Sequence, residues 1–197
     1  MPLTVFLEMT ITAVLTVWSP GPNNILLLSS ASTFGIRRNI RFMLGIWTGS
    51  LTLMLMCGFF CNTLAAIVPW LTNVLPYAGS VYLFYLAWQT ARRLPPSDNS
   101  MDKVPSYPMG IFLQLINVKI IIYGLTMFTA FILPNISTPA LILPLAVYLM
   151  ALGAAGNLIW AVAGNVLRLA YTKHYRTINL VMALLLVWCA LRVMGLL

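Results

Sequence analysis

The sequence predicts an all-α, polytopic membrane protein with six transmembrane helices, arranged as an inverted 3+3 repeat in which helices one and four are broken. Three observations lead to this fold. Of the 197 residues, 61% are hydrophobic and only 7% are charged, whereas about a quarter of the residues in soluble domains are charged. The apolar runs suit crossings of about 20 residues. Basic residues gather at every second connection. Residues 1–197 are therefore expected to form a single transmembrane domain.

The first predicted span covers residues 3–33 and is interrupted by Ser19-Pro20-Gly21-Pro22-Asn23-Asn24. A proline has no N–H and clashes with the carbonyl four residues back, so the carbonyls of Thr16 and Trp18 lose their helical partners. The pieces on either side are each shorter than the about 20 residues that a crossing needs. We interpret them as one broken span, a device found in transporters. A re-entrant hairpin and an ordinary proline-rich turn are the alternatives.

The other spans follow from apolar runs between turn-forming residues. They are predicted at residues 42–61, 74–92, 109–133, 140–167 and 178–196. Asn62, Pro69, Asn73 and Pro76 mark the turn between the second and third spans. A polar loop at residues 92–108 follows the third span, and a basic stretch at residues 168–176 follows the fifth.

The basic residues predict the orientation. Nine of the eleven flank the connections after spans one, three and five: Arg37, Arg38, Arg41, Arg92, Arg93, Lys103, Arg168, Lys173 and Arg176. Cytoplasmic connections carry such an excess, so both termini are expected in the periplasm. The net charge of +8 then reflects membrane topology and does not indicate nucleic-acid binding.

An odd number of spans in each half reverses the direction of the second half, so span four should correspond to span one. Its irregular stretch is Gln114-Leu115-Ile116-Asn117-Val118-Lys119, with an amide and a cation inside an apolar run. Intramembrane polar groups are functional by default. In a straight helix Asn117 and Lys119 would point about 200° apart, so either the helix loosens or only one of them faces the pathway. Lys119 either contacts substrate or binds carbonyls freed in span one, and the two roles are compatible.

Small residues in spans two and five allow helices to approach closely. They are Gly45, Gly49, Gly153, Gly156 and Gly164. Helix packing is the favoured interpretation of these positions. Contact of the neighbouring Asn157 and Trp160 with substrate is the alternative.

The residue inventory excludes several kinds of site. One histidine and three acidic residues, with Asp98 and Asp102 in a loop and Glu8 near the outer edge, cannot build a catalytic set at the membrane midplane. The three cysteines lie in apolar runs, so we expect no metal and no cofactor. The sequence has no glycine-rich loop followed by Lys and Ser/Thr, so we expect no ATP hydrolysis by this chain. An enzyme is therefore not expected, and a non-transporting membrane assembly subunit remains the rival from another class.

The proline-glycine-proline triplet at residues 20–22, together with Asn117-Val118-Lys119-Ile120-Ile121 and Tyr123-Gly124, resembles the LysE/RhtB family of amino-acid exporters over essentially the whole chain. Val118 replaces a proline found in many members, in agreement with the subgroup that exports cysteine and O-acetylserine. The resemblance implies export of small amino acids or their metabolites across the bacterial inner membrane, driven by an ion gradient. We expect the proton as coupling ion, and a homo-oligomer is compatible with the pattern.

The predicted substrate is a small neutral amino acid resembling cysteine or O-acetylserine, because no carboxylate apart from Glu8 lies in a span to accompany a cationic side chain. Threonine, homoserine or leucine are the alternative substrates. The half-helix that opens at Pro22 should present the N–H groups of Asn23, Asn24 and Ile25 to the substrate carboxylate, with the freed carbonyls of span one for its ammonium. The predicted substrate-binding residues are Pro20, Gly21, Pro22, Asn23, Asn24, Asn117 and Lys119.

Overall fold

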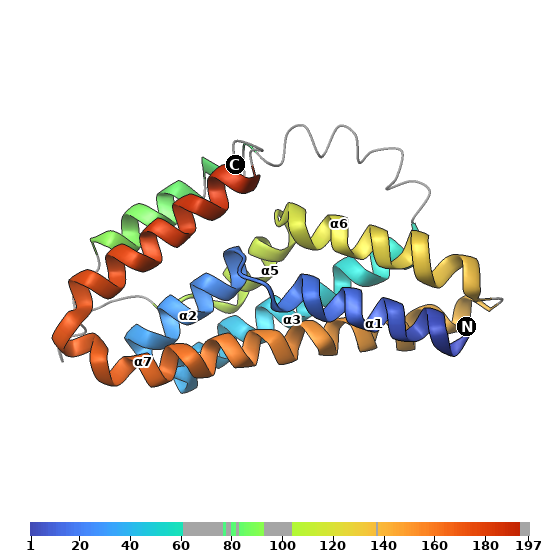
Figure 1. The fold of residues 1–197 in the computed structure, drawn as a ribbon, viewed down its shortest axis with the longest axis horizontal. Coiled ribbons are helices and arrows are strands. Elements are labelled where there is room, and N and C mark those ends of the chain that lie inside the picture. Colours follow the sequence, from blue (N-terminus) through green and yellow to red (C-terminus); the bar gives the residue numbers. More distant parts are fainter. Residues whose placement is uncertain (61–76, 78–79, 82, 93–103, 137, 194–197) are drawn as a thin grey trace.

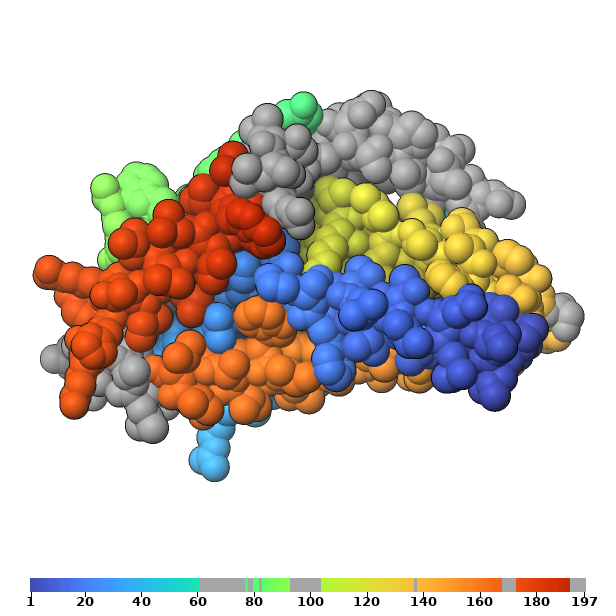
Figure 2. Space-filling view, viewed as in Figure 1, coloured from blue at the N-terminus to red at the C-terminus, as the bar shows by residue number. Residues whose placement is uncertain are grey.

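The computed structural model describes residues 1–60, 77, 80–81, 83–92, 104–136 and 138–193. This part of the chain is helical and contains no strand. Most helices run along the long axis of the molecule (Figure 1). Figure 2 shows α1 (Leu3–Trp18) lying between α6 (Val118–Thr126) and the first part of α7 (Ile142–Val193), and these helices are in contact.

The predicted break in the first span is confirmed. Helix α1 ends at Trp18 and α2 (Pro22–Phe34) begins at the second proline, with a bend of 50° between them. Every residue of α2 after Pro22 is buried, so this helix is surrounded by protein on all sides. The buried residues of α2 include six polar ones, which are Asn23, Asn24, Ser29, Ser30, Ser32 and Thr33.

A single residue, Gly35, joins α2 to α3 (Ile36–Phe59). Its φ of 78° lies in the left-handed region that glycine adopts at little cost. Asn39 donates a hydrogen bond to the Gly35 carbonyl at 2.9 Å, which holds the turn. The second span therefore begins at residue 36 and not at 42, and the cluster Arg37, Arg38 and Arg41 lies exposed on the first turns of α3 instead of in a loop.

The number of spans is established in part. The described residues contain four helices long and apolar enough to cross a membrane, or five when the bent pair α1 and α2 counts as one crossing. The predicted third span is helical at residues 80–81 and 83–91. The rest of that span, the turn predicted at Asn62 to Pro76 and the loop at residues 93–103 lie outside the described residues.

The fourth span is broken, although it has no proline at the break. Helix α5 (Tyr107–Leu115) ends before Asn117, which is extended with φ −79° and ψ 95°, and α6 begins at Val118. The amides of Ile120 and Ile121 donate to the Asn117 carbonyl at 2.9 and 3.0 Å. After α6 come a π-helical turn, η1 (Met127–Ile132), and a 3₁₀ turn, η2 (Leu133–Asn135). The helix thus loosens at the stretch that the sequence singled out.

The last two predicted spans are two helices that meet at a kink, and α7 denotes both of them. After the 3₁₀ turn η3 (Pro139–Leu141), α7 runs from Ile142 to Val193, with non-helical angles only at His174 (φ −125°, ψ 28°). The basic stretch at residues 168–176, expected between these spans, is helical except at the His174 kink, and it contains no proline or glycine that would end a helix. The kink separates two apolar stretches, Pro139–Leu167 and Lys173–Leu191, whose directions differ clearly in Figure 1. Residues 194–196 of the predicted sixth span lie outside the described residues.

Glycines bring the helix backbones together. A Cβ on Gly45 would lie 2.1 Å from the Tyr107 carbonyl oxygen, and one on Gly164 would lie 2.3 Å from that of Leu28. The packing interpretation is thus confirmed for α3 against α5 and for α7 against α2. The exception is Gly153, where a Cβ would meet nothing within 4 Å.

Candidate functional site

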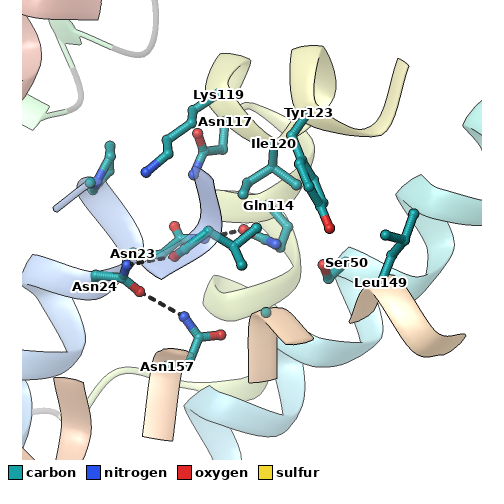
Figure 3. Close-up of a pocket in the computed structure, with 14 residues that line it drawn as sticks. Asn23, Asn24, Ser50, Gln114, Asn117, Lys119, Ile120, Tyr123, Leu149 and Asn157 are labelled. Atoms are coloured by element: carbon teal, nitrogen blue, oxygen red, sulfur yellow. Dashed lines mark hydrogen bonds between the residues drawn. The ribbon is translucent and has the colours of Figure 1, made fainter. Parts of the chain in front are cut away.

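The two broken spans meet at one pocket. Its walls come from the α1–α2 break, α3, the α5–α6 break and α7 (Figure 3). Six of the seven predicted site residues line it: Gly21, Pro22, Asn23, Asn24, Asn117 and Lys119. The seventh, Pro20, lines a neighbouring hollow with Ser19, Lys119 and Trp188. Residues about 100 positions apart in the chain are therefore brought together as predicted.

Asn117 and Lys119 both face the pocket, because the chain is extended at Asn117 and the helix restarts after it. Figure 3 shows the two side chains extending toward the α1–α2 break. A straight helix would have turned them apart. The break therefore resolves the geometric conflict.

Lys119 ties the two breaks to each other. Its Nζ donates to the Ser19 carbonyl at 3.2 Å and to Ser19 Oγ at 2.8 Å. The same Nζ would lie 3.0 Å from a Cβ on Gly21, so a larger residue at position 21 would crowd the ammonium group. The structural role considered for Lys119 is present, and the side chain also lines the pocket.

Amide side chains hold the broken backbone. Asn24 Nδ2 donates to the carbonyls of Val17 and Ser19, both at 3.0 Å. Asn157 on α7 donates in turn to Asn24 Oδ1 at 2.9 Å. Asn23 Nδ2 donates to Gln114 Oε1 on α5. These bonds satisfy carbonyls that the break frees, and they connect four helices around the pocket.

The carbonyls of Thr16 and Trp18 are not free, contrary to our expectation. Ser19 Oγ donates to the Thr16 carbonyl at 2.8 Å, and Trp160 Nε1 donates to that of Trp18 at 3.0 Å. A freed carbonyl in an apolar setting is costly without a donor, and here the protein supplies one. Trp160 lies one helical turn after Gly156, and Trp18 packs against Gly156. This spacing was the feature of the sequence that could have indicated a contact between Trp160 and residue 18.

Two helix N-termini lie at the pocket, because α2 begins at Pro22 and α6 at Val118. The first N–H groups of a helix have no partner within it, and the helix dipole places partial positive charge there. Three N–H groups were predicted to bind a carboxylate, those of Asn23, Asn24 and Ile25. The Ile25 amide already donates to the Gly21 carbonyl at 2.9 Å, which is the first hydrogen bond of α2. The N–H groups of Asn23 and Asn24 precede that bond and are the two that remain for a carboxylate. Lys119 adds a positive charge, and none of the described residues that line the pocket is acidic, so the pocket favours an anion.

Two buried polar atoms at the pocket have no partner among the described residues, Asn23 Oδ1 and the Tyr123 hydroxyl. Asn23 is 6% exposed and Tyr123 is 4% exposed, so neither atom is compensated by bulk water. Native proteins pair most buried polar groups. We did not predict Tyr123 as a site residue, although its place one turn after Lys119 on α6 was a usable signal. Both atoms are available to a bound molecule.

The pocket is small in this conformation. Its free volume is about 30 Å³, room for about two water molecules. The neighbouring hollow, which shares Gly21, Pro22 and Lys119 with the pocket, has a free volume of about 200 Å³. Two glycines, Gly21 and Gly153, line the cavity. Because they have no side chain, they take up little of its volume.

The other candidate groups lie elsewhere. Glu8 on α1 is exposed and does not line the pocket. Cys57 and Cys189 are buried and form no disulfide, while Cys61 lies outside the described residues. In the part of the chain that the structure describes, no three residues of the His, Cys, Asp and Glu types group as a metal site.

Comparison with known proteins identifies relatives over nearly the whole chain. The model of the LysE type translocator family matches residues 14–195. A cysteine/O-acetylserine efflux protein of Escherichia coli is 38% identical over 179 residues, which cover 91% of this chain and 92% of that protein. The protein of the same description from Salmonella typhimurium is 37% identical over the same shares. No solved structure matches the chain.

Proposed function

The chain belongs to the family of LysE type translocators, and we propose that it exports small neutral amino acids or related metabolites, such as cysteine or O-acetylserine, across the bacterial inner membrane. The relatives named as cysteine/O-acetylserine efflux proteins support this substrate class. The observation that carries the proposal is the pocket where the N-termini of α2 and α6 meet beside Lys119. Helix N-termini facing a midplane site are how transporters hold the carboxylate of an amino acid.

The chemistry of the pocket suits a zwitterion. The substrate carboxylate would lie against the N–H groups of Asn23 and Asn24 and against Lys119, the positive side of the site. The unpaired Asn23 Oδ1 would accept from the substrate ammonium. Since the two charges of an amino acid are separated by two bonds, both can be met within one short stretch of the broken helix.

We also propose six spans in an inverted repeat with both termini in the periplasm. Exposed basic residues at the turn into α3, at the end of the third span and at the α7 kink support it: Arg37, Arg38, Arg41, Arg92, Lys173 and Arg176. The positive-inside bias would place these residues on the cytoplasmic side. A cysteine placed at Ser100, within the connection proposed as cytoplasmic, should stay unlabelled by an impermeant reagent in intact cells. Labelling there would contradict the topology and the repeat.

The proton is the proposed coupling ion, and a pocket between two broken helices is typical of carriers that work by alternating access. In proteoliposomes, substrate accumulation should follow an imposed pH gradient and collapse when a protonophore removes it. If accumulation instead follows a sodium gradient at constant pH, the coupling ion is sodium and not the proton.

Counterflow tests the function itself. Proteoliposomes preloaded with unlabelled cysteine or O-acetylserine should take up the labelled compound, and protein-free vesicles should not. A well-folded protein that exchanges no amino acid would favour the non-transporting assembly subunit. Strong exchange of leucine, or of threonine and homoserine, without exchange of cysteine would show that these amino acids are the substrates and that cysteine is not.

A further inference from the structure

The Tyr123 hydroxyl is a buried polar group that forms no hydrogen bond with the described residues. The ring belongs to a cluster of buried apolar side chains that includes Met54, Phe128 and Leu149. Its hydroxyl is fully buried and without a hydrogen-bond partner among the described residues. A phenylalanine would fill the same space without leaving a polar atom unpaired. The hydroxyl therefore points to a partner that the folded chain does not supply.

The Tyr123 hydroxyl and the Lys119 ammonium group lie on different sides of the pocket. Figure 3 shows Lys119 and Asn117 extending toward the α1–α2 break, whereas the Tyr123 ring extends toward Ser50 and Leu149. All of them line the same cavity. A molecule whose charged groups occupy the break would present its remaining atoms to Tyr123.

One stripe of α7 leaves room for those atoms. Leu149, Gly153 and Asn157 are spaced four residues apart, so they lie on one face of the helix, and all three line the cavity. Asn157 reaches the broken helix through Asn24. Gly153, one turn away, has no atom within 4 Å of the place where a Cβ would stand. The cavity can thus extend along this stripe from the break toward Tyr123.

We infer that the Tyr123 hydroxyl, in the cavity that Ser50 and Gly153 also line, forms the subsite for the polar tip of the substrate side chain. This inference rests on the proposed function and adds the residue that selects among neutral amino acids. A phenol can donate one hydrogen bond and accept another, so it suits an ester carbonyl, a hydroxyl or a thiol. An alkyl side chain of the same length would leave the hydroxyl unpaired.

The test compares matched substrates in counterflow. O-acetylserine and norleucine have side chains of the same length and differ in the ester oxygens, and cysteine and 2-aminobutyrate differ in the thiol. The parent protein should prefer the polar member of each pair. In Tyr123→Phe the ratio of O-acetylserine exchange to norleucine exchange should fall by about tenfold, the worth of one buried hydrogen bond. The preference for cysteine should fall less, because a thiol is a weak hydrogen-bonding group.

An unchanged preference in Tyr123→Phe, or an equal loss for both members of a pair, would overturn the subsite. A parent protein that exchanges no amino acid would overturn the proposed function instead, and the subsite with it. Gly153→Ala is a second variant that does not depend on Tyr123. Its methyl group enters the cavity without meeting the protein, so it should slow O-acetylserine at least several-fold more than cysteine. Equal exchange of both compounds in Gly153→Ala would contradict the placement of the side chain along this stripe.

Discussion

Lys119 is a cation inside a span whose partners in the described structure are neutral. Its ammonium group is held by the carbonyl and hydroxyl of Ser19, and no acidic side chain lines the pocket. A cation in an apolar setting is stabilised far better by an opposite charge than by dipoles alone. The substrate carboxylate would supply that charge, which gives Lys119 a role in binding in addition to its contact with Ser19.

Lys119→Ala should lower transport per folded protein by more than tenfold and should also lower thermal stability, because it removes a bond between the two breaks. Ser19→Ala is the comparison variant: it removes the Oγ partner of Lys119 and the donor to the Thr16 carbonyl, and it leaves the Ser19 carbonyl in place. Counterflow normalised to the monodisperse protein in detergent measures the first effect, and thermal unfolding measures the second. Parent-like transport by Lys119→Ala would remove this residue from the site.

Asn117 permits a cleaner test of function. Its side chain caps no amide of α6, so Asn117→Ala leaves the helix start intact and should change the free energy of unfolding by less than about 1 kcal/mol. The amide lines the pocket and is 8% exposed. We expect transport to fall by about tenfold, as for the loss of a substrate hydrogen bond. Parent-like transport with a lowered melting temperature would make Asn117 a structural residue.

The Asn24–Asn157 hydrogen bond joins α2 to α7 at the pocket. Asn157→Ala leaves Asn24 Oδ1 without its donor, and an unpaired buried acceptor costs about 1–3 kcal/mol. The double variant Asn24→Ala, Asn157→Ala should therefore be less destabilised than the sum of the single variants. Thermal or denaturant unfolding in detergent of all four proteins gives the coupling. Additive losses would show that the bond contributes nothing of its own.

At the scale of the helix, three glycines of α7 provide a graded test of packing. A Cβ on Gly164 would lie 2.3 Å from a backbone oxygen of α2, one on Gly156 would lie 2.6 Å from the Trp18 ring, and one on Gly153 would meet nothing within 4 Å. A backbone atom cannot rotate away, whereas a side chain can. The three positions therefore differ in what must move.

Gly164→Ala should destabilise the protein most, by about 1–3 kcal/mol, because α2 and α7 must separate. Gly156→Ala should cost less, and Gly153→Ala should be neutral or stabilising by up to about 1 kcal/mol, since alanine favours the helix. Melting temperatures of the three purified variants would rank them. A Gly153→Ala variant as unstable as Gly164→Ala would contradict the open space beside Gly153.

The sequence predicted the breaks better than the helix ends. Proline removes a donor and clashes wherever it stands, so the break at residues 19–21 follows from covalent geometry. The break at Asn117 has no proline and was marked only by an amide and a cation in an apolar run. The one-residue turn at Gly35 and the continuous helix through residues 168–173 escaped prediction, because basic residues were taken to mark loops. Arginine and lysine are good helix formers, so charge alone does not end a helix.

The partners of the site depended on long-range contacts that no local pattern contains. Asn24 could be singled out as polar, but its bond to Asn157 joins residues 133 positions apart. Gln114 was part of the irregular stretch, while its pairing with Asn23 depends on how the fold places the start of α2 relative to α5. The sequence thus identified polar residues in the spans correctly. It could not show which of their atoms the protein would satisfy and which it would leave for a ligand.

At the scale of the whole molecule, charge selectivity follows from where acidic groups are absent. The pocket combines two helix N-termini with Lys119, and its lining residues include no carboxylate. Glu8, the acid of the first span, is exposed on α1 away from the pocket. A cationic side chain would have to shed its water beside a positive site without a counter-charge, and burying an unpaired charge is strongly unfavourable. The architecture therefore selects for zwitterions with neutral side chains.

Lysine and arginine should accordingly show less than a tenth of the counterflow of cysteine in the parent protein. Gly153→Asp would place a carboxylate in the cavity at the only α7 glycine with free space around it among Gly153, Gly156 and Gly164, so lysine exchange should rise relative to cysteine exchange in that variant. Gly153→Asn, of the same size without the charge, is the control and should not admit lysine. Because aspartate and asparagine differ here only in charge, a gain in both would indicate a steric effect. Lysine exchange equal to that of cysteine in the parent protein would refute selection by charge, since the positive site would then have to tolerate a second cation.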